Sequence, residues 1–225
     1  MAVRSESPVS DAVQDYAKAI WSLAQRSNEP VSTSAIAERL EVSPASASAM
    51  VKRLEALGLA TREPYHGVRL TPAGQRVALA VLRHHRLLEL YLAEALGMSW
   101  DRVHEEAEVL EHAISPELSE LIATKLGNPT HDPHGDPIPT RDGEIDEPRT
   151  QALADLPPGA RGRFVRVSDA DPEMLRYLAE RGIGPGDRFH VLEREPFEGP
   201  LTVRFQGRSH VLGGALTRAM RTVPA

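Results

Sequence analysis

The stretch from His104 to His112, H-E-E-A-E-V-L-E-H, combines residue types and spacings that could bind a metal ion. If the stretch is helical, four of its side chains share one face that spans about 100°. They are His104, Glu108, Glu111 and His112, at i, i+4, i+7 and i+8. A helix of a globular protein usually turns an apolar face inward, but this face consists of imidazole and carboxylate, which are ligands for divalent first-row metals. We therefore predict a metal-binding helix here.

A second pair, His85 and Glu89, repeats the i, i+4 spacing upstream. Each of these residues alone is more simply explained as part of a solvated charged face or as a buried, hydrogen-bonded histidine. The run of four together with the upstream pair favours metal binding. Three alternatives stay open at this point: a di-iron carboxylate enzyme, a regulator that answers an organic ligand, and a metal-storage or delivery module. The stretch has no strict Glu-x-x-His motif, which argues against the enzyme.

Composition narrows the class of protein further. The chain has 225 residues, no cysteine and a net charge of −6, so we expect neither disulfides nor a thiolate metal site. No apolar run approaches the roughly 18 residues of a membrane span, and the N-terminus lacks a signal sequence. We therefore expect a cytoplasmic protein without membrane contact. The segment from Trp100 to Glu147 holds thirteen Asp/Glu against three Lys/Arg, whereas Met1 to Thr71 is balanced at eight each.

The N-terminal third predicts a winged helix-turn-helix. We expect helices over Ser10–Arg26 and over Ser43–Leu57, and a short one through Leu40 that Thr33 or Ser34 caps. Ser43 with Pro44 provides a natural helix start and Gly58 a natural stop. The segment Leu59–Leu70, interrupted by P-Y-H-G, predicts a β-hairpin.

In a winged helix-turn-helix the second helix of the motif enters the major groove of DNA, so the Ser43–Leu57 helix would read DNA and the hairpin would contact its backbone. The alternative is that the small residues of this helix only let helices pack closely. The candidate DNA contacts are Ser43, Ala45, Ser46, Ser48, Ala49, Lys52, Arg53, Arg62, Tyr65 and Arg69.

The rest of the chain predicts further helices and then strands. Helices are expected over Pro72–Leu96, after a Ser99 cap, and from Ser115-Pro116 to Gly127. Alternating segments after Gly159, with one helix over Pro172–Arg181, favour a small barrel. The expected fold class is mainly α with a C-terminal small β-barrel. Its domains are a winged helix-turn-helix (1–73), a helical dimerisation and metal-binding domain (74–140), a linker (141–158) and the barrel (159–225).

A winged helix followed by H-R-L-L-E, V-H-E-E-A-E-V-L-E-H, P-H-G-D-P-I-P and a small β-barrel resembles the diphtheria toxin repressor family. The resemblance covers nearly the whole chain and corresponds to the long form with an SH3-like (FeoA-like) C-terminal domain. It implies a metal-dependent transcriptional repressor of iron or manganese homeostasis, not an enzyme. It also implies a homodimer that binds a palindromic double-stranded DNA operator and about two metal ions per subunit.

The resemblance assigns an activating site to Asp15, Glu108, Glu111 and His112. Iron-type members have Met at the position of Asp15 and Cys at that of Glu108. Carboxylates at both positions make the ligand set harder, which favours Mn²⁺, with Fe²⁺ next. Small single-domain manganese members have Glu one turn after the Asp. This chain has Lys18 there, which we expect either to contact a ligand carboxylate or to stay in solvent.

The resemblance also implies an ancillary metal site, closed by the linker and the barrel. Its expected ligands are His85, Glu89, His104, Asp132, His134 and Asp171. Asp171 precedes Pro172 at a helix start, so it could instead be an N-cap, or fill both roles through different oxygens. Dimer contacts are expected from apolar faces between Ala78 and Ile122.

Overall fold

The computed structural model describes residues 9–25, 29–63, 66–146, 149–197 and 199–225. Its internal contacts divide the chain into two compact units. The first comprises Met1–His85, Glu111–Ser119 and Pro139–Glu144, and the second comprises Arg86–Leu110, Glu120–Ile138 and Ile145–Ala225. None of the described helices is both long and apolar enough to cross a membrane.

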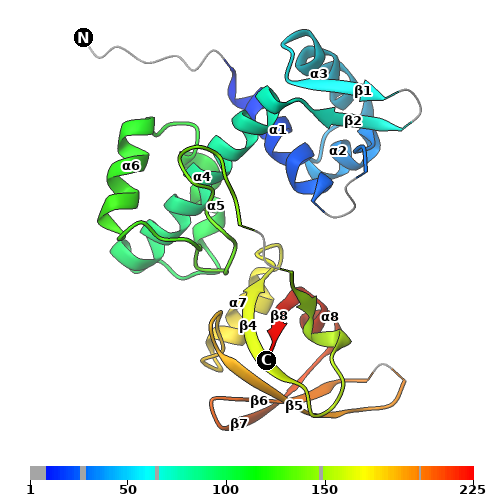
Figure 1. Cartoon of the computed structure of the whole chain (residues 1–225), viewed down its shortest axis with the longest axis vertical. Coiled ribbons are helices and arrows are strands. Elements are labelled where there is room, and N and C mark those ends of the chain that lie inside the picture. Colours follow the sequence, from blue (N-terminus) through cyan, green and yellow to red (C-terminus); the bar gives the residue numbers. More distant parts are fainter. Residues whose placement is uncertain (1–8, 26–28, 64–65, 147–148, 198) are drawn as a thin grey trace. The chain divides into compact units, whose positions relative to one another are not determined.

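The first unit contains the winged helix-turn-helix predicted from the sequence (Figure 1). Its elements are α1 (Asp11–Ala24), α2 (Thr33–Arg39), α3 (Pro44–Ala56), β1 (Ala60–Glu63), β2 (Gly67–Leu70) and the start of α4 (Pro72–Leu96). The two strands pair antiparallel from Ala60↔Leu70 to Glu63↔Gly67. Val31 adds an isolated bridge to Val68, which ties the chain before α2 to the hairpin.

Helical spacing of apolar residues explains how this unit packs. α1 buries Val13, Tyr16 and Ile20 at i, i+3 and i+7, and these meet buried residues of α2 and α3 in one core. Ser43 begins α3 as predicted, because its side chain accepts a hydrogen bond from the Ser46 amide. The predicted cap of α2 was wrong: Ser32, not Thr33 or Ser34, accepts from the Ala35 amide.

The second unit contains α5 (Val103–Leu110) and a C-terminal domain built on one antiparallel sheet. Helix α6 (Pro116–Lys125) is divided between the two units: its residues up to Ser119 belong to the first and those from Glu120 to the second. The strands are β3 (Gln151–Ala152), β4 (Arg161–Val167), β5 (Arg188–Arg194), β6 (Leu201–Phe205), β7 (Arg208–Leu212) and β8 (Met220–Pro224). Their order is β3-β8-β4-β5-β6-β7. The helices are η1 (Leu153–Asp155), α7 (Pro172–Ala179) and α8 (Gly214–Ala219).

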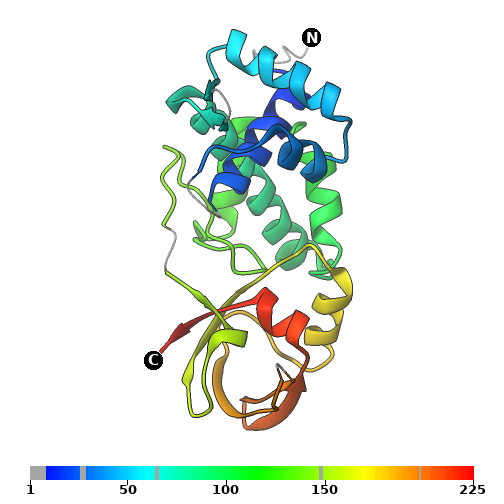
Figure 2. The same ribbon diagram turned by 90° about the vertical axis from the view of Figure 1, so that its right-hand side faces the viewer.

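The sheet differs from the predicted barrel in being open. Its edge strands β3 and β7 are not paired with each other among the described residues, although the strands curve strongly (Figure 2). Phe164, Phe205 and Leu178 lie with other buried side chains in one core of this domain. The predicted linker was too long, because Gln151 and Ala152 within it pair with β8. Strand β8 and helix α8 were not predicted.

Two helix ends in the metal-binding region also differ from the prediction. α5 begins at Val103, after a turn in which the Ser99 hydroxyl hydrogen-bonds the Asp101 carboxylate, so Ser99 is not its N-cap. α5 ends at Leu110, and Glu111 and His112 follow in a turn. The four side chains of the predicted metal-binding face therefore do not share one helix.

The segment P-H-G-D packs directly against β4. The His134 carbonyl accepts from the Val167 amide at 2.9 Å, and Gly135 has φ +88°. A Cβ at Gly135 would lie 1.9 Å from the Val165 carbonyl oxygen, so backbone would have to move. This position therefore requires glycine both for its φ and for its close approach to β4.

We expect Gly135→Ala to lower the free energy of unfolding by roughly 2 kcal/mol or more. Gly159→Ala is the matched control, because Gly159 has the same φ of +88° but nothing within 4 Å of its would-be Cβ. It should lose only about 1 kcal/mol from left-handed strain. Urea denaturation of both variants measures the difference, and equal losses would contradict the steric explanation.

Candidate metal centres and nucleic-acid interface

A first cluster of metal-ligand side chains lies in the first unit, where α1 meets the turn after α5. Asp15, Glu111 and His112 each place a ligand atom within 4.8 Å of the other two. His112 Nε2 lies 2.8 Å from Asp15 Oδ1 and 3.4 Å from Glu111 Oε1. On the other side of the ring, His112 Nδ1 lies 2.9 Å from Gln14 Oε1, which fixes the imidazole orientation. We name these three residues the first centre.

Glu111 is the buried residue of the first centre. Its side chain is 0% exposed, and both carboxylate oxygens have close partners. Lys18 Nζ donates to Oε1 at 2.6 Å, and His85 Nδ1 lies 2.6 Å from Oε2. His84 adds a contact of 3.2 Å between its Nδ1 and the Glu111 carbonyl oxygen. The structure therefore brings His85 to Glu111 of the activating site, whereas the sequence-based prediction placed it in the ancillary site alone.

The charges in the first centre favour a positive group beside Asp15 and Glu111. The hydrogen bond to Asp15 raises the pKa of His112, against an opposing effect of burial, and the Glu111 charge adds to the increase. Burial lowers the pKa of His84, and the hydrogen bond to the Glu111 carbonyl and the Glu111 charge oppose this effect. A divalent cation would supply the same compensation more strongly than a protonated histidine does.

Glu108, the fourth predicted ligand of the activating site, belongs to the second unit. It lies in the last turn of α5, and its Oε1 is 3.8 Å from His104 Nε2. Its side chain is 41% exposed. Its participation with Asp15 and Glu111 stays a prediction.

A second cluster lies in the second unit and joins α4, α5, the segment 132–136 and the loop after β4. His104 Nδ1 lies 3.2 Å from Glu89 Oε1 and 3.0 Å from Asp169 Oδ2. Glu89, Asp132 and His134 each place a ligand atom within 4.8 Å of the other two, and all three are buried. We name these five residues the second centre. His85, one turn before Glu89 on α4, was also predicted as a ligand here.

His134 has an imidazole nitrogen that is buried and without a hydrogen-bond partner among the described residues. Its Nε2 lies 2.7 Å from the Trp100 carbonyl oxygen and therefore donates to it. The other nitrogen, Nδ1, has no hydrogen-bond partner, and the nearest carboxylate oxygen, Glu89 Oε1, is 3.8 Å away. When the ring is neutral, Nδ1 carries a lone pair directed into the second centre, as a metal ligand requires.

Histidine pKa values in the second centre reflect its excess of negative charge. Burial opposes protonation of His104, but its hydrogen bonds with Asp169 and Glu89 raise its pKa to about 10. Burial likewise opposes protonation of His134, but the nearby charges of Glu89 and Asp132 raise its pKa to about 9. Burial and the Glu89 charge raise the pKa of Asp132. The carboxylates of the second centre therefore favour an additional positive charge among them.

Asp132 also shapes the loop that carries His134. Its Oδ1 accepts from the amides of His134 and Asp136, both at 2.9 Å. Its Oδ2 lies 3.7 Å from Arg86 Nε. Asp132 therefore holds the P-H-G-D loop in place.

The structure shows the N-cap role that the sequence left open for Asp171, and its role as a ligand stays a prediction. Asp171 is the N-cap of α7: its Oδ1 accepts from the amides of Glu173 and Met174. Pro172 at the first helical position explains why. Asp169, two residues earlier, supplies the carboxylate that faces His104. The sequence V-S-D-A-D-P contained both aspartates, and the proximity of Asp171 to the helix start was the available signal against it.

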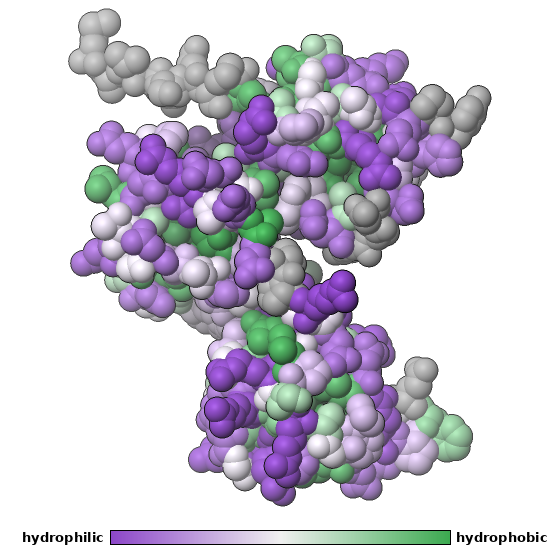
Figure 3. All heavy atoms as spheres, in the orientation of Figure 1, coloured by the Kyte–Doolittle hydropathy of each residue, from purple (hydrophilic) through white to green (hydrophobic). Residues whose placement is uncertain are grey.

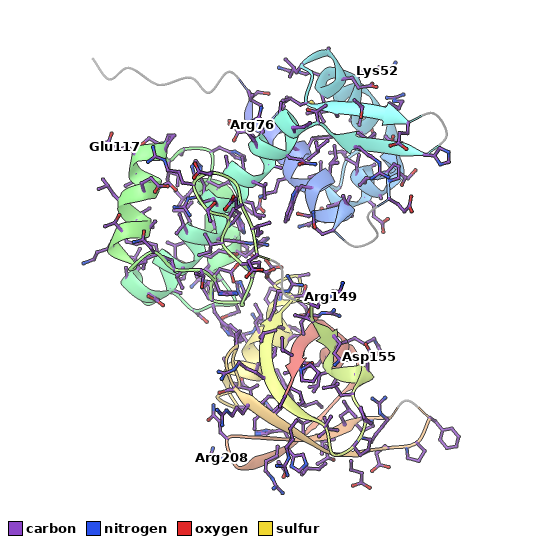
Figure 4. All side chains as sticks on the ribbon, viewed as in Figure 1. Lys52, Arg76, Glu117, Arg149, Asp155 and Arg208 are labelled. Atoms are coloured by element: carbon purple, nitrogen blue, oxygen red, sulfur yellow. The ribbon has the colours of Figure 1, made fainter. Side chains whose placement is uncertain are left out.

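The third candidate site is the outer face of α3. Ala47, Val51 and Leu54 are fully buried at i, i+4 and i+7, so the opposite face is turned to solvent. Ser48 is half-buried, and Lys52 is labelled on α3 in Figure 4. The exposed candidates on this face are Ser43, Ala45, Ser46, Ala49, Lys52 and Arg53.

In the hairpin, the candidate wing arginines have acidic partners. Arg69 Nε lies 2.7 Å from Glu63 Oε1, and Arg62 Nη2 lies 3.6 Å from Glu55 Oε2. Tyr65, the remaining hairpin candidate, lies outside the described residues.

Family models match three consecutive parts of the chain. Residues 9–68 match the iron dependent repressor N-terminal DNA binding domain, and residues 71–140 match the iron dependent repressor metal binding and dimerisation domain. Residues 151–220 match the FeoA domain. The three matches follow the order of the winged helix-turn-helix, the helices α4–α6 and the sheet domain.

Individual relatives agree with these matches. The diphtheria toxin repressor of Corynebacterium glutamicum is 32% identical over 94% of this chain and 95% of its own length. The iron-dependent repressor IdeR of Mycobacterium leprae is 32% identical over 80% of this chain and 84% of its own. A solved manganese-dependent transcriptional repressor in complex with manganese is 44% identical, with a TM-score of 0.87, and covers 95% of this chain and 100% of its own. The chain therefore belongs to the diphtheria toxin repressor family of metal-dependent, DNA-binding transcriptional repressors, which are not enzymes.

Proposed function

We propose that this protein is a Mn²⁺-dependent repressor of metal-uptake genes that also accepts Fe²⁺. The observation that carries the proposal is the first centre, in which Asp15 of α1 meets Glu111 and His112 from a segment almost a hundred residues later. α1 also packs into the core of the DNA-binding domain. A ligand that joins these two segments therefore acts directly on the element that supports α3.

The donor atoms of the first centre support manganese. Asp15 and Glu111 offer carboxylate oxygens and His112 an imidazole nitrogen, with Glu108 as the proposed fourth ligand. A set without sulfur suits Mn²⁺, then Fe²⁺, among the available metals. When bound, the cation would neutralise clustered carboxylates that otherwise repel one another.

The second centre supports a second ion per subunit. The unpartnered Nδ1 of buried His134 and the surplus of carboxylates fit a divalent cation held by Glu89, His104, Asp132, His134 and Asp169. We retain His85 as a further candidate for this ion. An ion with ligands from α4, α5 and the sheet domain would link these parts of the second unit.

We further propose that two copies of the chain bind a palindromic operator, with α3 of each copy in the major groove. Several large apolar side chains on α4, α5 and α6 are exposed and would be buried by a partner subunit: Leu96, Val109, Leu118 and Leu121. Figure 3 shows hydrophobic groups among hydrophilic ones over this region.

The test is a gel-shift titration on the DNA upstream of the protein's own gene, with Mn²⁺, Fe²⁺ or a chelator. We expect a complex with Mn²⁺ that the chelator removes. Salt concentration has to be held constant, because phosphate contacts make affinity depend on it. If the protein occupies the DNA equally after exhaustive chelation and with Mn²⁺, the proposal is wrong.

A further inference from the structure

One charged residue in contact with the first centre has no assigned role in metal binding. Lys18 lies one turn after Asp15 on α1, and its side chain is 13% exposed. Its Nζ lies 2.6 Å from Glu111 Oε1, across 93 residues of sequence. The lysine is therefore held inside the cluster, on a carboxylate proposed to bind the metal.

The Glu111 carboxylate needs this partner when no metal is bound. Its side chain is completely buried, and a buried charge without compensation is strongly unfavourable. Lys18 on Oε1 and His85 on Oε2 provide that compensation. The metal-free cluster is thus stabilised by a cation of the protein itself.

The same contact makes Lys18 a competitor of a metal ion for the Glu111 carboxylate. Glu111 Oε1 is the oxygen that also faces His112 Nε2, at 3.4 Å, so it points towards the other ligands of the first centre. An ammonium group has no lone pair with which to coordinate a metal. A divalent ion on this oxygen must therefore either displace Lys18 or bind beside its positive charge, and both reduce affinity.

We propose that Lys18 is a built-in counter-ion of the first centre that competes with the metal for Glu111. It thereby sets the metal concentration at which the protein responds. This inference rests on the proposed function, because it requires the first centre to bind the activating ion. A neutral residue at position 18 gives a regulator that responds at lower metal concentrations, with a less stable metal-free state.

The test combines calorimetric titration of Mn²⁺ with thermal unfolding, on the full chain. Lys18→Leu should bind Mn²⁺ at the first centre roughly tenfold more tightly or better. Its metal-free form should melt several degrees lower, and saturating Mn²⁺ should restore most of that loss. Lys18→Arg, which keeps the charge, should stay near wild type in both measurements, as should Lys125→Leu on the exposed side of α6.

The possible failures can be told apart. If wild type binds no Mn²⁺, the proposed function fails. If wild type binds but Lys18→Leu has unchanged or weaker affinity, the counter-ion role is overturned. If Lys18→Leu does not fold, Lys18→Gln, which is neutral but polar, decides by the same affinity comparison.

Discussion

Asp15→Ala should weaken Mn²⁺ binding at the first centre by roughly 100-fold or more, because even residues that only support ligands contribute 10- to 100-fold. Metal-dependent operator binding should be lost with it. Asp15 is the α1 residue that contacts His112, at 2.8 Å. Without its carboxylate, a bound ion no longer ties α1 to the turn that carries Glu111 and His112. The metal then has no differential affinity for the DNA-binding arrangement, and a ligand without such a difference shifts no equilibrium.

The matched control is Asp11→Asn. Asp11 lies one turn before Asp15 on α1 and is exposed, so its replacement changes charge on the same helix without removing a ligand. We expect it to retain Mn²⁺-dependent gel shifts. Both variants should remain dimeric by sedimentation, since Asp15 lies in the DNA-binding domain. If Asp15→Ala binds the operator as well as wild type does at the same metal concentration, Asp15 is not a ligand of the first centre.

Local patterns predicted most of the helical part of the fold. Ser43-Pro44 and Gly58 bracket α3 as observed, and Gly97 and Gly127 follow α4 and α6 with positive φ. Such signals are properties of a few adjacent residues, so they can be recognised without knowledge of tertiary contacts. The buried apolar residues of α1 likewise recur at helical spacing, a pattern that can be read from the sequence.

Features that depend on contacts distant in sequence could not be predicted in the same way. Helical spacing extended α5 through His112, but the helix ends at Leu110 and a turn carries Glu111 to Lys18 and His85. The pairing of β3 with β8 joins segments about 70 residues apart, so the local sequence of neither short strand could predict it. The choice of Asp169 over Asp171 depends on which carboxylate the helix cap leaves available.

Mn²⁺ binding at the second centre should release protons and strengthen as the pH rises from 7 to 9. The pKa of His104 is raised to about 10 and that of His134 to about 9, so both are protonated at pH 7 in the metal-free protein. A histidine must be neutral to bind a metal, so each ligating histidine loses its proton on binding. Affinity should therefore increase up to about tenfold per pH unit for each proton released.

The stability of the metal-free protein should change in the opposite sense. Both histidines have folded-state pKa values above the unfolded value of about 6.5, so their contribution to stability is complete below that pH. It is lost as the pH rises through about 9 for His134 and about 10 for His104. Alkaline pH thus weakens the metal-free second unit while it favours metal binding there.

Calorimetry of Mn²⁺ binding in two buffers with different ionisation heats counts the released protons. The Asp15→Ala background isolates the second centre, because His112 of the first centre also has a raised pKa. His134→Gln should release about one proton fewer near pH 7.5, whereas His131→Gln, an exposed neighbour in the same loop, should not change the count. A proton count of zero with affinity constant from pH 7 to 9 would mean that neither His104 nor His134 is a ligand, and the second centre would then be an ionic brace between α5 and the sheet domain.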